Sequence, residues 1–400
     1  MHSSLLKRYT HLRQHSLNLA APLSAEDQCV QSMSDTSPTK WHLAHTSWFF
    51  ENLVLLPFLP GYKVFDASFS YLFNSYYEAL GPRHPRPQRG LLTRPALSRV
   101  LAFRQYVDAS MQQLLSSKDV LAEQSLALIE LGMNHEQQHQ ELLLTDALHL
   151  LSCNPQLPAY NSSFSHPPAY FAELEWLSFD ESLTTIGRSV DQPGFSFDNE
   201  TPKHQRFVQS FQMANRLVTC GEYLSFINDG GYDKADLWLS EGRLQVLQNS
   251  WQCPQYWLAP GDPRSPSDHW QVFGLSGVQK LDPNTPVANL SFYEASAFAQ
   301  WSGARLPTEF EWEIASAHTD IHDLHSQVWQ WTRSAYEPYP GFVPATGAVR
   351  EYNGKFMVGQ QVLRGSSLAT PEHHSRHTYR NFFPAAARWQ FSGLRLAKDN

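Results

Sequence analysis

Cysteine is scarce in this sequence, and the four that occur lie far apart. No two of them form a CxxC pair, so the pattern excludes a disulfide scaffold and a zinc ribbon and favours a reducing compartment. Long apolar runs are also missing, since no stretch reaches the ~18 apolar residues that a membrane-spanning helix needs. Residues 1–20 lack the apolar centre of a signal peptide. We therefore expect a cytoplasmic protein with no membrane partner.

Runs of basic residues are missing as well. The formal net charge is -8, and the cluster of Arg83, Arg86 and Arg89 is too short to neutralise a phosphate backbone. We therefore expect no nucleic-acid partner. Aromatic residues, by contrast, are abundant at 13% of the chain, which indicates aromatic-lined pockets or rigid cores.

The length of 400 residues predicts two domains, because one hydrophobic core rarely organises so long a chain. Up to about residue 151, apolar residues recur at helical spacing, and Ser37 is predicted to be a helix cap that is followed by Pro38 at the first helical position. The pattern predicts about four helices, enough for a bundle. Proline-rich residues 156–172 suit a linker between a domain at 1–155 and a second domain at 173–400.

The second domain shows a different pattern. Short aromatic or β-branched segments alternate with turns rich in Gly, Asn, Asp and Pro, as expected for strands. Two helices are predicted by the capping boxes Ser291-x-x-Glu294 and Thr308-x-x-Glu311. The fold class is therefore two-domain α+β, with a helical bundle followed by an irregular α+β domain.

The sharpest local signal is the pair His135 and His139 in the sequence HEQQH. Residues four apart share one face of a helix, so both imidazoles can reach one metal ion. A third ligand must come from another helix, and His42 and His45 are the best source, although only one of them need bind. The spacing alone leaves other interpretations open: ordinary surface histidines, a zinc hydrolase with Glu136 as general base, or an iron site with open positions.

At this point the sequence resembles a family, the ergothioneine-forming sulfoxide synthases (EgtB). The resemblance covers nearly the whole chain, and the segments that carry it are each weak alone but highly specific together. The segments are KWHLAHTSWFFE (40–51), FNSYYEALGPRHPRPQRGLLTRP (73–95), HEQQHQELLLTD (135–146), GEYLSFINDGGY (221–232), ARLPTEFEWEIA (304–315), VWQWTRS (328–334) and RNFFPAAARWQFSGLRLA (380–397). The resemblance implies a DinB-like four-helix bundle followed by a formylglycine-generating-enzyme-like domain, which is related to C-type lectins.

The resemblance also implies the metal and the reaction. The family's three Fe(II) ligands correspond to His45, His135 and His139. His42 is then a neighbour that orients the site or simply packs. The family uses dioxygen to join a thiol to the imidazole of hercynine, which is Nα-trimethylhistidine. A tyrosine supplies a proton or electron, and this role falls on Tyr77, with Tyr76 in reserve.

The substrate-binding residues follow from the same resemblance. Arg86 and Arg89 suit the carboxylate of an amino-acid thiol, because a guanidinium meets a carboxylate with two hydrogen bonds. Gln138 corresponds to a residue that hydrogen-bonds a ligand beside the iron. The betaine-binding residues fall on Asn381, with Phe382, Phe383 and Trp389 as aromatic walls that can attract its trimethylammonium group or simply pack in the core.

The thiol is expected to be free cysteine. In the branch that uses γ-glutamylcysteine, an Asn-Trp-Asp segment and a following arginine bind the extra carboxylate, whereas this chain has Asn381, Phe382 and Phe383 followed by Pro384. Arg388 lies one position away from that arginine. The alternatives that stay open are an ovothiol-type synthase acting on free histidine, the zinc hydrolase, and a non-catalytic binding module.

Overall fold

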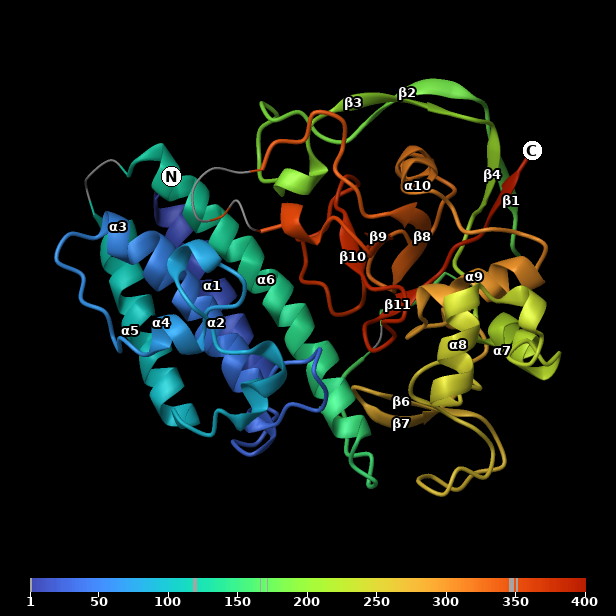
Figure 1. Ribbon diagram of the computed structural model, residues 1–400, viewed down its shortest axis with the longest axis horizontal. Coiled ribbons are helices and arrows are strands. Elements are labelled where there is room, and N and C mark those ends of the chain that lie inside the picture. Colours follow the sequence, from blue (N-terminus) through green and yellow to red (C-terminus); the bar gives the residue numbers. More distant parts are fainter. Residues whose placement is uncertain (1, 118–120, 166, 171, 345–348, 350–351) are drawn as a thin grey trace. The chain divides into compact units, whose positions relative to one another are not determined.

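The computed structural model describes residues 2–117, 121–165, 167–170, 172–344, 349 and 352–400 (Figure 1). The chain forms two compact units. The first contains residues 1–161 and 345–352, and the second contains residues 162–344 and 353–400. The division at 161/162 falls inside the expected linker, 156–172, of which residues 166 and 171 lie outside the described part.

The first unit is helical, as the periodicity predicts. Its four long helices are α1 (His2–Ala20), α2 (Thr39–Phe50), α5 (Leu97–Ser116) and α6 (Glu123–Ser152). The shorter elements are η1 (Asp27–Cys29), η2 (Glu51–Leu55, a π-helical turn), α3 (Leu56–Phe58), α4 (Phe69–Leu72), η3 (Glu78–Leu80) and η4 (Arg86–Leu91). Helix α2 packs against α5 and α6, and α1 packs against the same two helices.

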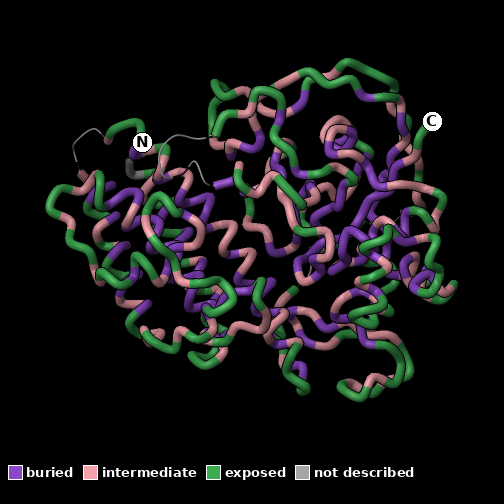
Figure 2. Tube along the Cα trace, in the orientation of Figure 1, coloured by how far each residue is buried: buried purple, intermediate pink, exposed green. Residues whose placement is uncertain are grey.

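Helix α2 is the centre of this unit, because all of its residues are buried. On α5, by contrast, buried residues recur every three or four positions and the remaining positions face outward, so buried and exposed segments alternate along it (Figure 2). The start of α2 differs from the prediction. Pro38 occupies the position before the helix, and the Ser37 hydroxyl makes no capping bond but accepts a hydrogen bond from Arg89.

The second unit mixes short sheets and helices, so the α+β prediction is confirmed. Its strands are β1 (Trp176–Phe179), β2 (Ser182–Ile186), β3 (His204–Val208), β4 (Phe211–Ala214), β5 (Trp257–Leu258), β6 (Gln271–Gly274), β7 (Gly277–Lys280), β8 (Trp329–Ala335), β9 (Gln361–Gly365), β10 (Asn381–Phe383), β11 (Ser392–Gly393) and β12 (Ala397–Asp399). They pair as β1-β4-β12, β10-β9-β8-β11, β2-β3 and β5-β6-β7. The helices are η5 (Asp198–Glu200), α7 (Cys220–Asn228), η6 (Ala235–Leu237), α8 (Ser240–Asn249), α9 (Phe292–Trp301), α10 (Glu309–Ala315) and η8 (Gly354–Phe356).

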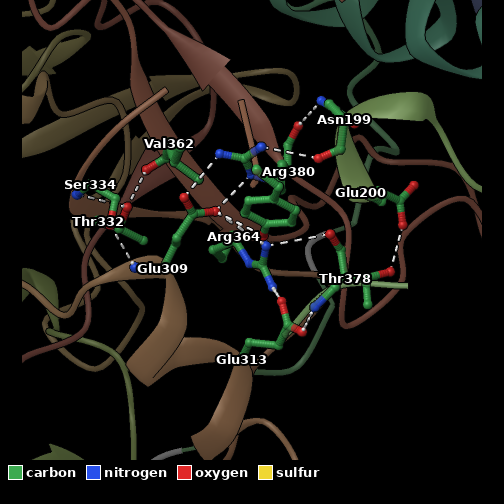
Figure 3. A network of polar contacts seen from close by, with 12 residues as sticks. Asn199, Glu200, Glu309, Glu313, Thr332, Ser334, Val362, Arg364, Thr378 and Arg380 are labelled. Carbon is green, nitrogen blue, oxygen red and sulfur yellow. Dashed lines mark hydrogen bonds and ion pairs between the residues drawn. The ribbon is translucent and has the colours of Figure 1, made fainter. Parts of the chain in front are cut away.

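Both predicted capping boxes are confirmed. Ser291 accepts from the Glu294 N–H at the start of α9, and Thr308 accepts from the Glu311 N–H at the start of α10. Helix α10 also carries Glu309, whose carboxylate binds Arg380 through two hydrogen bonds of 2.7 and 3.0 Å (Figure 3). Such buried ions remain paired because an unpaired charge in the core is costly. Arg364 of β9 also pairs with Glu309 and Glu313, so this network ties α10 to β9.

Among the described residues, no helix is both long and apolar enough to cross a membrane.

Helices α2 and α6 approach each other closely at Gly132. A Cβ atom added there would lie 2.7 Å from Cε1 of Phe50 and 2.8 Å from Cε1 of Phe49. Gly132 precedes His135 by one helical turn, so this contact sets how closely the histidines of the two helices meet.

We expect Gly132→Val to lower the free energy of unfolding of the first unit by about 1–3 kcal/mol, because rigid ring edges cannot yield to the added methyl groups. Denaturant unfolding followed by circular dichroism measures the change. Gln124→Val, at an exposed position in the first turn of α6, is the matched control and should stay within about 0.5 kcal/mol of the wild type. Wild-type stability of Gly132→Val would contradict the close packing.

Candidate metal centre

Three histidines meet between α2 and α6. His45 comes from α2, and His135 and His139 come from successive turns of α6. One ring nitrogen of each lies within 4.8 Å of those of the other two, and Nε2 of His45 is 3.1 Å from Nε2 of His135. The structure thus brings together the three histidines that the resemblance selects, and it places His42 outside this cluster.

All three imidazoles are in the neutral form that binds metals. Burial lowers the pKa of His135 to about 3, although the Glu136 carboxylate acts in the opposite direction. Burial, followed by the neighbouring His135, lowers the pKa of His45 and of His139 well below the usual value. Near neutral pH each ring therefore has a lone pair to offer.

The surroundings of His45 fix which nitrogen carries that lone pair. Its Nδ1 lies 2.6 Å from the carbonyl oxygen of Phe73, which can only accept a hydrogen bond, so Nδ1 carries the hydrogen. Nε2 then presents a lone pair toward His135. Trp41 and Trp48 stack on the His45 ring, with centroids 4.6 and 5.7 Å away, and hold its plane. Converging neutral nitrogen donors of this kind suit a transition-metal ion.

Glu136 is engaged elsewhere. Its carboxylate accepts hydrogen bonds from Arg13, Arg104 and Ser16, and the side chains of both arginines are buried. Burial raises the pKa of this carboxyl, but the two arginines outweigh it and hold the pKa at about 2. A carboxylate so strongly ionised and fully hydrogen-bonded is a poor general base. The geometry therefore disfavours the zinc-hydrolase interpretation of the HExxH motif.

The two tyrosines lie in the loop that follows α4. Tyr77 is fully buried, and its ring stacks on Tyr76 at 4.7 Å and lies 5.5 Å from Trp48, which itself stacks on His45. Asn74 holds the loop by exchanging hydrogen bonds with the backbone of Tyr77. Tyr77 is thus one ring away from the histidine cluster.

Arg89 and Arg86 have different environments. Arg89 is buried, its guanidinium lies 3.4 Å from the centre of the Trp41 ring, and it donates to the hydroxyls of Ser37 and Ser75. Burial, followed by the charge of Arg86, lowers its pKa. Within the described part of the chain Arg89 forms no ion pair with a carboxylate. Arg86 is exposed and donates to the carbonyl of Asp35.

Gln138 has a partner that the sequence did not reveal. Its Oε1 accepts a hydrogen bond from the hydroxyl of Tyr352. Tyr352 belongs to the first unit, although it comes after residues 162–344 of the second unit in the sequence. The Tyr352 ring also contacts His135 and Tyr76, with centroids 5.9 and 6.1 Å away. No local pattern announces this position, because the chain returns to the bundle from a distance of some two hundred residues.

The remaining predicted residues belong to the second unit. Asn381, Phe382 and Phe383 form β10, and all three are partly buried. Phe382 stacks on Tyr336 at 4.1 Å, and Phe383 meets Trp389 edge to face at 5.8 Å. The Asn381 side chain accepts from the backbone N–H of Phe382.

Comparison with known proteins places both units in known families. The sulfatase-modifying factor enzyme 1-like family matches residues 178–320 and 316–400, and the DinB superfamily matches residues 8–143. The chain is 29% identical to the hercynine oxygenase of Mycobacterium tuberculosis, covering 93% of both chains. It is 29% identical to the hercynine oxygenase of Mycolicibacterium thermoresistibile, over 91% of this chain and 87% of that one. It is 25% identical to the ergothioneine biosynthesis protein 1 of Schizosaccharomyces pombe, over 51% of this chain and 28% of that one.

We expect His45→Ala, His135→Ala and His139→Ala each to bind Fe(II) or Co(II) more weakly. The loss should exceed the roughly 10–100-fold that follows removal of an outer partner of a ligand. Metal competition titration measures it. His149→Ala is the control, because His149 lies on α6, is partly buried and bonds to Ser32 rather than to the cluster. Wild-type affinity in His45→Ala would exclude His45 as a ligand.

Proposed function

Because the chain belongs to the sulfatase-modifying factor enzyme 1-like family and, within it, to the hercynine oxygenase group of sulfoxide synthases, we propose that it is an iron-dependent enzyme that joins cysteine to the imidazole of hercynine with dioxygen. The observation that carries this proposal is the cluster of three neutral histidines in a DinB-like bundle, two of them buried and His139 partly buried. Neutral imidazole nitrogens are donors that suit iron, as they suit several other transition metals.

The reaction balances with dioxygen as the only oxidant. A carbon–sulfur bond forms as the thiol and the imidazole C2 each lose a hydrogen. One oxygen atom enters the product as the sulfoxide, and the other leaves as water. His45, His135 and His139 would hold the iron ion, which would supply the activation of dioxygen and bring the two substrates together in one site.

The side chains of the first unit have separate roles in this proposal. Arg89 binds the cysteine carboxylate, because its buried charge has no carboxylate partner among the described residues and a guanidinium forms two hydrogen bonds to such a group. Arg86, which is exposed, assists at the entrance. Gln138 holds the hercynine imidazole. The hydroxyl of Tyr352 donates to Oε1 of Gln138 and helps to hold this side chain.

The betaine-binding role is assigned to residues of β10. Asn381 binds the hercynine carboxylate, and Phe382 and Phe383 offer aromatic faces to the trimethylammonium group. Free cysteine is the thiol that these residues favour. Arg388, which lies one position away from the arginine that binds the second carboxylate in the other branch, is 3.1 Å from the buried Glu294 and donates to the carbonyl of Cys253. Its charge is therefore already compensated.

The first test of this function is oxygen consumption. Protein loaded with Fe(II) under nitrogen should consume dioxygen rapidly only when hercynine and cysteine are both present, and should form one sulfoxide for each dioxygen. An oxygen electrode and mass spectrometry measure the two quantities. Zinc-loaded protein is the control and should be inactive. Equal uptake with zinc, or with hercynine omitted, would show that the assigned chemistry is wrong.

The second test concerns the proton donor. Tyr77→Phe should keep metal and substrate binding but lower kcat at least about a hundredfold, because the phenol contributes general-acid catalysis worth roughly 10²–10⁴-fold. Little change in KM is expected, since the hydroxyl acts in the reacting complex. Steady-state rates of sulfoxide formation and of thiol oxidation measure the effect.

Tyr76→Phe is the matched control, because its ring stacks on that of Tyr77 in the same loop. A normal rate for Tyr77→Phe with an inactive Tyr76→Phe would exchange the two roles. Wild-type rates for both variants would exclude both tyrosines as donors.

A further inference from the structure

His139 is connected to a carboxylate through a second histidine. Nδ1 of His139 lies 2.8 Å from Nδ1 of His42, and Nε2 of His42 lies 3.0 Å from Oδ2 of Asp146. His42 and Asp146 are both buried. Asp146 follows His139 by seven residues, which is about two helical turns, so the two side chains share one face of α6.

The direction of these hydrogen bonds follows from their chemistry. An ionised carboxylate can only accept, so Nε2 of His42 carries a hydrogen and donates it to Asp146. In the tautomer with its hydrogen on Nε2, His42 has a lone pair on Nδ1, which accepts the hydrogen on Nδ1 of His139. The remaining nitrogen of His139, Nε2, is left with its lone pair free for a metal. The backbone N–H of Ser37 donates to the same Oδ2 at 2.8 Å and holds the carboxylate in place.

Nδ1 of His45 also has a hydrogen-bond acceptor, which is the carbonyl oxygen of Phe73. Two of the three clustered histidines therefore have an acceptor at Nδ1. For His135 the structure shows no such partner among the described residues, and its buried Nδ1 is left without a hydrogen bond. The orientation of the centre thus depends on the partners of His45 and His139.

We infer that His42 and Asp146 are positioning residues of the metal centre, which hold His139 in the tautomer and orientation that bind the ion. His42 acts as an acceptor for His139, and Asp146 fixes His42. The inference rests on the proposed function in one respect only, namely that His139 is a ligand. Outer partners of this kind change metal affinity by roughly 10–100-fold when they are removed.

Three substitutions of His42 separate this role from simple packing. Asparagine places a carbonyl oxygen near the position of Nδ1, so His42→Asn keeps an acceptor for His139. Glutamine reaches the position of Nε2, so His42→Gln keeps the partner of Asp146 and leaves His139 without its acceptor. His42→Ala removes both. Glutamine is closer to histidine in size. If His42 only filled space, His42→Gln would therefore disturb the centre less than His42→Asn.

The experiment measures the dissociation constant for Co(II) by competition with a chelator, together with the visible absorption spectrum of bound Co(II). We expect His42→Ala and His42→Gln to bind Co(II) about 10–100-fold more weakly with an altered spectrum. His42→Asn should stay close to the wild type in both measurements. His149→Ala, a histidine of the same helix outside the cluster, should show wild-type affinity and spectrum.

Two results would overturn the inference: wild-type affinity and spectrum in both His42→Ala and His42→Gln, or a loss in His42→Asn equal to that in His42→Gln. If His42→Ala does not fold, the comparison of the asparagine and glutamine variants carries the test. A failure of the proposed metal site is recognised separately, because His45→Ala, His135→Ala and His139→Ala would then bind Co(II) as well as the wild type.

Discussion

The packing of three imidazoles between α2 and α6, with His45 and His135 buried and His139 partly buried, is the constraint on which the centre depends. In water a histidine exchanges protons near neutral pH, whereas these rings are held neutral because burial disfavours the charged form. Neutral rings can lie with nitrogens 3.1 Å apart, where protonated ones would repel each other. The close approach at Gly132 and the indole rings on His45 keep this geometry in place.

Burial also favours a partner for the other charged groups nearby. Glu136 follows His135 directly, yet neighbouring positions on a helix point about 100° apart, so its carboxylate meets Arg13 and Arg104 instead of the cluster. Helix α6 therefore presents two faces with different tasks. One face offers neutral nitrogens with lone pairs, and the other joins α1 and α5 through buried ion pairs.

Much of this organisation was predictable from local patterns. The helical period before residue 151, the capping boxes at Ser291 and Thr308, and the spacing of His135 and His139 follow from interactions within one or two turns of chain. Ser37 was predicted wrongly as a helix cap, because its hydroxyl is taken by Arg89, fifty-two residues away. Sequence spacing likewise could not decide whether His42 or His45 is the third ligand. Both lie on α2, and only their contacts with α6 distinguish them.

By itself, then, the sequence determined the fold class and, through its resemblance to a family, the residues to consider for iron, thiol and betaine. Tertiary structure alone decided which side chains interact. His42 forms hydrogen bonds with Asp146 and His139, Glu136 forms ion pairs with two arginines, and Tyr352 donates a hydrogen bond to Gln138. The reason is physical. Helix periodicity and capping are encoded by near neighbours, whereas hydrogen-bond partners and burial depend on segments that come together only when the chain folds.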